Sequence, residues 1–123
     1  RVLVIEDDTN TRAALARWLQ YEYDVTTAED GLDGIRQALE HTPDAIVADV
    51  WMPRMDGIAM VRRLKEHDAL RRVPVILLSG QTSVEAVVAG LAAGVRAYLY
   101  KPVDLDLLDR KLRSALHDQV RAR

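Results

Sequence analysis

The stretch that decides the fold covers residues 45–57 and reads AIVADVWMPRMDG. Its first four residues are apolar, as in a short strand buried on both faces, and Asp49 follows them directly. Pro53 and Gly57 then indicate a loop. Parallel sheets bind ligands beyond the carboxyl ends of their strands, so this pattern places the Asp49 carboxylate at an edge where chemistry can occur.

Apolar segments of strand length recur along the chain and alternate with segments of helical period. Strands are predicted at residues 2–5, 24–28, 45–48, 75–78 and 97–100, of which residues 24–28 carry the weakest pattern. A helical stripe follows each strand and is clearest at Leu105, Leu108, Leu112 and Leu116. This alternation predicts an α/β fold, a doubly wound five-stranded parallel sheet with helices on both faces.

The composition excludes several classes of function. With 123 residues we expect one domain over residues 1–123, and because the chain starts at Arg1 we expect it to be part of a longer protein. A net charge of −2 argues against nucleic-acid contact by this domain. The lack of cysteine excludes disulfides and thiolate chemistry and fits a cytoplasmic location. No apolar run reaches the ~18 residues that a membrane span needs.

Other polar residues also stand where predicted strands end. Asp7 and Asp8 follow residues 2–5, Ser79 follows residues 75–78, and Lys101 follows residues 97–100. Each has a plain structural alternative, because an acid before a helix is often a cap and a serine before a glycine is often a turn. The carboxyl ends of parallel strands meet at one edge, however, so we expect these side chains to join Asp49 in one site.

The residue types in this predicted site suit the chemistry of phosphate. Carboxylates at Asp7, Asp8 and Asp49 would repel one another unless protons or a metal ion intervened. Ligands that are all oxygen favour a hard cation, and Mg²⁺ is the natural one. Lys101 adds a positive point charge and Ser79 a hydroxyl donor. The set therefore favours phosphoryl transfer to or from a carboxylate.

The order of these motifs resembles the receiver domain of two-component response regulators, over nearly all 123 residues. The motifs that carry the resemblance are the acidic pair Asp7-Asp8, Asp49 followed by Met52-Pro53 and Asp56-Gly57, then Ser79, and finally Lys101-Pro102. The resemblance implies a flavodoxin-like sheet of strand order 2-1-3-4-5. It also implies a regulatory phosphoacceptor domain of a phosphorelay rather than an enzyme with its own substrate.

The resemblance also implies roles for individual residues at the metal. Asp49 would accept the phosphoryl group from the phosphohistidine of a sensor histidine kinase or a phosphotransfer protein, giving an aspartyl phosphate. Asp7, Asp8 and Asp49 would hold Mg²⁺ together with the backbone carbonyl of Trp51. The indole of Trp51 would either shield the acyl phosphate or contact the kinase, or it would have no role. Gln81 is a further position that could steer attacking water.

A second group of implied roles concerns the response to phosphorylation. Ser79 and Lys101 would contact the phosphoryl group, and the peptide bond between Lys101 and Pro102 is expected to be cis. Tyr98 would turn inward as Ser79 moves, which would alter the surface formed by the fourth helix, fifth strand and fifth helix. Residues 84–91 of that helix contain one charged residue, Glu85. The helix is either buried under its own domain or docks an output partner or a second copy in a homodimer.

Three competing functions remain open at this point. A Mg²⁺-dependent aspartyl phosphatase often needs a second Asp two residues after its nucleophile, where this chain has Trp51. A flavin-binding module needs a loop rich in Ser, Thr or Gly after the first strand, whereas residues 6–8 are acidic and would repel phosphate. A degenerate receiver would act through protein contacts alone, although this chain keeps every chemical group that phosphotransfer needs.

Overall fold

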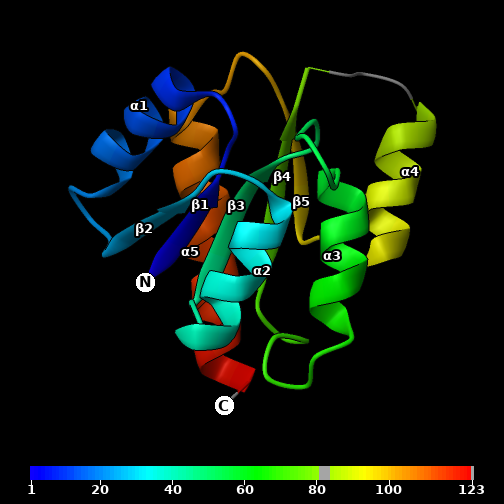
Figure 1. Ribbon diagram of the computed structural model, residues 1–123. Helices are drawn as coiled ribbons and strands as arrows, with labels where there is room; N and C mark the ends of the chain where they lie inside the picture. Colours follow the sequence, from blue (N-terminus) through cyan, green and yellow to red (C-terminus); the bar gives the residue numbers. More distant parts are fainter. Residues whose placement is uncertain (81–83, 123) are drawn as a thin grey trace.

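A parallel sheet forms the centre of the molecule in the computed structural model, which describes residues 1–80 and 84–122 (Figure 1). Its strands are β1 (Val2–Ile5), β2 (Val25–Ala28), β3 (Ala45–Asp49), β4 (Val75–Ser79) and β5 (Ala97–Tyr100). All neighbouring strands are parallel, and their order is β2-β1-β3-β4-β5. The predicted doubly wound sheet and its strand order are confirmed.

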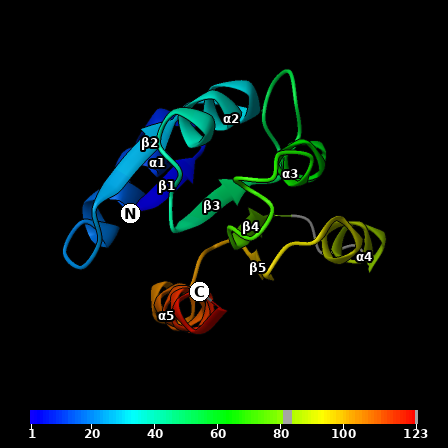
Figure 2. The same ribbon diagram turned by 90° about the horizontal axis from the view of Figure 1, so that it is seen from below.

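Helices cover both faces of this sheet, as Figure 2 shows. They are α1 (Thr9–Leu19), α2 (Gly31–Glu40), α3 (Gly57–Lys65), α4 (Val84–Ala93) and α5 (Leu105–Ala122). The first and last helices pack on one face, while α2, α3 and α4 lie on the other. Each strand is therefore followed by a helix that returns the chain to the start of the next strand.

Burial explains why the central strands read as unbroken apolar runs. Every residue of β1, β3 and β4 is buried, because helices cover both faces of these strands. Side chains alternate, so Leu3 and Ile5 enter the core beneath α2 and α3, while Val2 and Val4 enter the core beneath α1 and α5. The edge strand β2 exposes two threonines. That exposure explains why residues 24–28 gave the weakest strand pattern.

Aspartates start the first three helices at the carboxyl edge of the sheet. The side chain of Asp8 accepts a hydrogen bond from the backbone N–H of Thr11 at 2.8 Å and begins α1. Asp30 caps α2 and Asp56 caps α3 in the same way. Such a cap stabilises a helix by about 1 kcal/mol. The acidic residues at this edge thus fall into two groups: those that cap helices and those that cap none.

Candidate functional site

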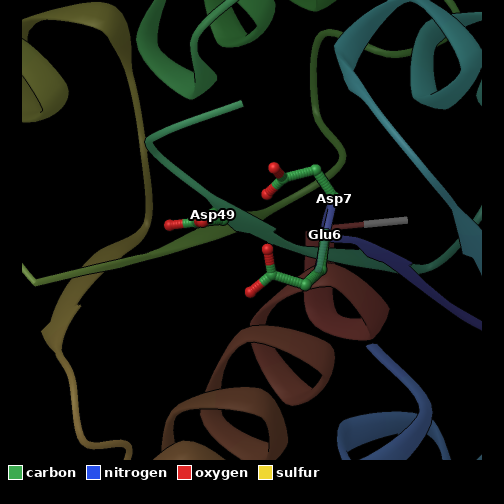
Figure 3. A group of neighbouring side chains, drawn as sticks. All are labelled: Glu6, Asp7 and Asp49. Carbon is green, nitrogen blue, oxygen red and sulfur yellow. The ribbon is translucent and has the colours of Figure 1, made fainter. Parts of the chain in front are cut away.

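Three carboxylates come together beyond the ends of β1 and β3. Glu6, Asp7 and Asp49 each offer an oxygen, and these oxygens lie within 4.8 Å of one another (Figure 3). The sheet register brings them together, because Ile5 pairs with Ala48 and the residues that follow these two along the chain are Glu6 and Asp49. Glu6 is 1% exposed and Asp49 7% exposed, whereas Asp7 is open to solvent.

The prediction that Asp8 joins this group is wrong. Its carboxylate is engaged by its own helix, since it accepts hydrogen bonds from the backbone N–H of Thr11 at 2.8 Å and from the Thr11 hydroxyl at 2.6 Å. These bonds, the side-chain one first, lower the pKa of Asp8 below its ordinary value. Asp8 is therefore the N-cap of α1 and lies outside the carboxylate group formed by Glu6, Asp7 and Asp49.

Glu6 is the functional candidate that the sequence reasoning missed. It is the first residue after β1 and its backbone N–H donates to the Ala28 carbonyl at 3.1 Å, which continues the pairing of β1 with β2. The signal that could have found it is the end of the apolar run at Ile5. The acidic pair at the strand end is Glu6-Asp7, one residue earlier than predicted.

Lys101 bridges the two buried carboxylates. Its Nζ donates to Glu6 Oε1 at 3.0 Å and lies 3.3 Å from Asp49 Oδ2. The peptide bond from Lys101 to Pro102 is cis, as predicted. Burial lowers the pKa of the Lys101 ammonium, but the hydrogen bond with Glu6 and the charges of Asp49 and Glu6 outweigh burial, so the pKa is raised overall. Lys101 therefore stays protonated beside Asp49.

Glu6 has an ionisation that differs from that of an ordinary glutamate. Burial is the largest cause and raises the pKa of Glu6 to about 7, while the hydrogen bond from Lys101 opposes this rise and the charge of Asp49 adds to it. A buried carboxylate next to another acid resists ionising. The Glu6 carboxyl thus gains or loses its proton near neutral pH unless a cation compensates its charge.

Ser79 lies at the same edge, as predicted. It is the last residue of β4 and is fully buried. The backbone N–H of Lys101 donates to the Ser79 carbonyl at 2.8 Å, and Asp49 pairs with Leu78, the residue before Ser79. Strand pairing therefore fixes the chain positions of Asp49, Ser79 and Lys101 relative to one another. Gln81 lies outside the described residues.

Tyr98 has its ring turned into the molecule. The ring packs against the core beneath α2 and α3, and its hydroxyl is buried with no hydrogen-bond partner in the described part of the chain. A Cβ placed on Gly90 of α4 would lie 3.2 Å from Tyr98 Cδ2, so this glycine makes room for the ring. The ring of Tyr100 meets it edge-on at 5.8 Å between centroids.

Apolar side chains are exposed at two places near this site. In α4 they are Val84, Val88 and Leu91, which are 72%, 56% and 55% exposed, while Gly90 is the buried residue of this helix. The alternative that α4 is buried under its own domain is therefore wrong for this face. The side chain of Trp51 is 56% exposed, in the loop that follows β3.

The donor set fits a hard divalent cation. All side-chain donors in the group are carboxylate oxygens, two of the three residues are buried, and Lys101 supplies the nearby positive charge within 4 Å. With Glu6 ionised, three negative charges face one ammonium, so the pocket carries an uncompensated negative charge. Oxygen ligands with excess negative charge are what Mg²⁺ binds in proteins.

Comparison with known proteins decides the family. A sequence model described as the response regulator receiver domain matches residues 2–113. The chain belongs to this family. Receiver domains are regulatory, which disfavours the flavin module and the aspartyl phosphatase. Among the described residues, no helix combines the length and apolar character needed to cross a membrane.

Several relatives support the assignment of this receiver domain. The transcriptional regulatory protein PrrA of Mycobacterium tuberculosis is 44% identical over 117 residues, which cover 94% of this chain and 49% of PrrA. The response regulator MprA of Mycobacterium ulcerans is 38% identical over 94% of this chain and 50% of its own length. The chain thus spans about half the length of these curated relatives.

Solved structures give the same fold. The chemotaxis protein CheY4 of Vibrio cholerae superposes with a TM-score of 0.87 at 30% identity, covering 93% of this chain and 96% of CheY4. The receiver domain of the Francisella response regulator 1452 gives a TM-score of 0.88 at 30% identity, covering 95% of this chain and 96% of that one. The flavodoxin-like fold predicted from the motifs is therefore confirmed.

Proposed function

We propose that this receiver domain is a switch that accepts a phosphoryl group on Asp49 from the phosphohistidine of a histidine kinase or phosphotransfer protein. The observation that carries the proposal is the position of Asp49, a nearly buried carboxylate at a strand end beside two further acids and the Lys101 ammonium. A capping or solvated aspartate has no such surroundings. Asp8 and Asp56 show the contrast, since both are exposed and cap helices.

Glu6, Asp7 and Asp49, with the backbone carbonyl of Trp51, would hold Mg²⁺ in this domain. When bound, Mg²⁺ supplies positive charge that neutralises the oxygens of the transferring phosphoryl group. An oxygen of Asp49 attacks phosphorus as the bond from phosphorus to the kinase histidine breaks, and the product is an aspartyl phosphate. Burial of Asp49 and Glu6 keeps the oxygens free of competing hydrogen bonds from bulk water.

Lys101 changes partners during this reaction. In the unphosphorylated protein its ammonium is shared between Glu6 and Asp49. Phosphorylation replaces the charge of the Asp49 carboxylate by that of the phosphoryl oxygens, and the ammonium follows the charge. The Ser79 hydroxyl donates to another phosphoryl oxygen from the end of β4. Both residues thereby favour the phosphorylated state of the loops that they belong to.

The output surface of the switch is formed by α4, β5 and α5. Exposed apolar side chains at Val84, Val88, Leu91 and Tyr100 provide a face for an output domain or a second copy of the chain. Tyr98 packs directly behind α4 at Gly90, so its ring links this face to the edge that carries Lys101. We infer that residues 1–123 are the receiver part of a longer cytoplasmic regulator, because PrrA and MprA are about twice as long.

Labelling by acetyl phosphate tests the proposal. Wild-type protein with Mg²⁺ should gain one phosphoryl group, seen by intact mass, and chelation of Mg²⁺ should prevent it. Asp49→Asn should abolish labelling, because an amide oxygen is a poor nucleophile for phosphorus. Asp56→Asn is the matched control, since it removes a nearby acid that caps α3 and should label normally. Undiminished labelling of Asp49→Asn, or none of the wild type, would refute phosphotransfer to Asp49 and favour a degenerate receiver.

A further inference from the structure

An ion pair between the buried Asp30 and the exposed Arg54 ties the loop after β3 to the start of α2. Asp30 is 5% exposed and uses both carboxylate oxygens: Oδ1 accepts from the backbone N–H of Asp33 at 2.9 Å, and Oδ2 binds the Arg54 guanidinium. The first bond caps α2, as the corresponding bonds of Asp8 and Asp56 cap α1 and α3. The ion pair with Arg54 joins residues that are 24 positions apart in sequence. No ion pair of this kind is found at the capping residues Asp8 and Asp56 within the described part of the chain.

The loop itself adopts a conformation that needs such support. Arg54 has φ of 69°, in the left-handed region that residues with a side chain rarely adopt. Conformations of this kind persist where surrounding contacts hold them in place. A Cβ placed on Gly31 would lie 3.2 Å from the carbonyl oxygen of Met55, so the loop runs directly beside the start of α2 (Figure 2).

The far end of the loop is anchored at β3. The N–H of Gly57 donates to the Val50 carbonyl at 2.7 Å, and a Cβ on Gly57 would lie 2.6 Å from the Asp49 carbonyl oxygen. Trp51 stands between this anchor and Arg54, and its own side chain is largely exposed. The course of the backbone at Trp51 is therefore set by contacts on either side of it.

We infer that Asp30 and Arg54 are positioning residues that hold the Trp51 carbonyl in place for the cation. This inference rests on the proposed function, in which that carbonyl completes the ligand set of Glu6, Asp7 and Asp49. Neither Asp30 nor Arg54 belongs to the carboxylate group, so they act through the loop. Residues that orient metal ligands typically change metal affinity by about tenfold or more when they are removed.

Mg²⁺ affinity measured through Trp51 tests the inference. The chain has two tryptophans, so Trp18→Phe leaves Trp51 as the single indole and its fluorescence reports Mg²⁺ titrations. In that background, Asp30→Asn keeps a good capping residue but removes the ion pair. Arg54→Gln removes the ion pair from the other side, at a largely exposed position where folding is not at risk. Both variants should weaken Mg²⁺ binding by about tenfold.

The sign of the Arg54→Gln effect separates positioning from simple charge. Long-range electrostatics predicts that losing Asp30 weakens Mg²⁺ binding and that losing Arg54 strengthens it. Positioning predicts weaker binding for both, with the double variant no weaker than either single one, because the two residues act as a unit. The matched control is Arg36→Ala, which breaks ion pairs to Asp33 and Glu40 on the same helix but none to the loop. It should bind Mg²⁺ like the parent.

Each outcome of these titrations has a distinct meaning. Wild-type affinity in both variants, or tighter binding by Arg54→Gln, overturns the positioning role while leaving the metal site intact. Loss of affinity in Arg36→Ala equal to that in Asp30→Asn also overturns it, because helix α2 and not the loop would then be responsible. Absence of Mg²⁺ binding by the parent, by fluorescence and by calorimetry, overturns the proposed metal site and this inference with it.

Discussion

The edge of the sheet at Asp49 and the outer face of α4 are built in opposite ways. At the edge, buried acids and one lysine contact one another at 3.0 and 3.3 Å, and strand pairing fixes where each residue stands. On α4, only Gly90 is buried among the described residues, and valines and a leucine face solvent. The first region can hold a reaction geometry. The outer face of α4 makes few contacts within the domain, so binding a partner there would break few of them.

The sharpest test of the edge compares two acids that stand two residues apart. Glu6→Gln removes a buried charge from the carboxylate group, and Asp8→Asn removes one from a helix cap while keeping a good capping residue. We expect Glu6→Gln to weaken Mg²⁺ binding by more than about tenfold and Asp8→Asn to leave it within about twofold. Isothermal titration calorimetry measures both. Equal losses in the two variants would restore Asp8 to the site.

The face of α4 should respond to substitution without any change at the edge. Val88→Glu places a charge in the centre of the exposed stripe, and glutamate is a good helix former, so the free energy of unfolding should change by less than about 0.5 kcal/mol. Association of the protein activated with beryllofluoride should weaken by about tenfold, because a charge in an apolar contact must lose its water. Sedimentation velocity measures the association.

A matched control for Val88→Glu lies on another helix. Leu39 in α2 is 45% exposed, and Leu39→Glu introduces the same charge away from α4. It should leave association unchanged, and both variants should keep their Mg²⁺ affinity. If Leu39→Glu impairs association as strongly as Val88→Glu, the surface of α4, β5 and α5 is not the contact.

The smallest predicted effect concerns the ring that lies between the two regions. The buried hydroxyl of Tyr98 has no partner among the described residues, so Tyr98→Phe should raise the free energy of unfolding by about 1 kcal/mol in the unphosphorylated protein. Tyr100→Phe is the control, because Tyr100 is 47% exposed and should change stability little. Urea unfolding followed by circular dichroism measures both. A destabilised Tyr98→Phe would show that the hydroxyl is satisfied in solution.

The sequence predicted the strands and most of the polar residues at the carboxyl edge of the sheet, because each apolar run ends just before such a residue. The sequence predicted the positions of Asp49, Ser79 and Lys101 at this edge. Asp49 and Ser79 end the fully buried strands β3 and β4, and Lys101 directly follows β5, which pairs with β4. The error at Asp8 has a physical cause. Three consecutive acids follow β1, and which of them caps α1 depends on the residue at which the helix begins, here Thr9.

The exposure of α4 could not be predicted from its residues. Apolar side chains surround the helix, so no face of the sequence pattern identifies the side that meets the sheet. Packing decides it through the smallest residue, because Gly90 allows α4 to approach the ring of Tyr98. The pair of Asp30 and Arg54 was equally hidden, since nothing in a sequence signals an ion pair between two loops.

Strand β5 lies at the border of the sheet and, among the described strands, pairs with β4 alone. Tyr98 lies within β5 and Lys101 directly follows it. A strand held from one side slides more easily than one held from two. A shift of β5 that draws the Lys101 ammonium toward a phosphoryl group on Asp49 would also move the ring of Tyr98, because the two residues are three positions apart on the same segment. Phosphorylation at the edge of the sheet and the change at the surface of α4 would then be coupled by one displacement of β5, without a chain of side-chain rearrangements through the core.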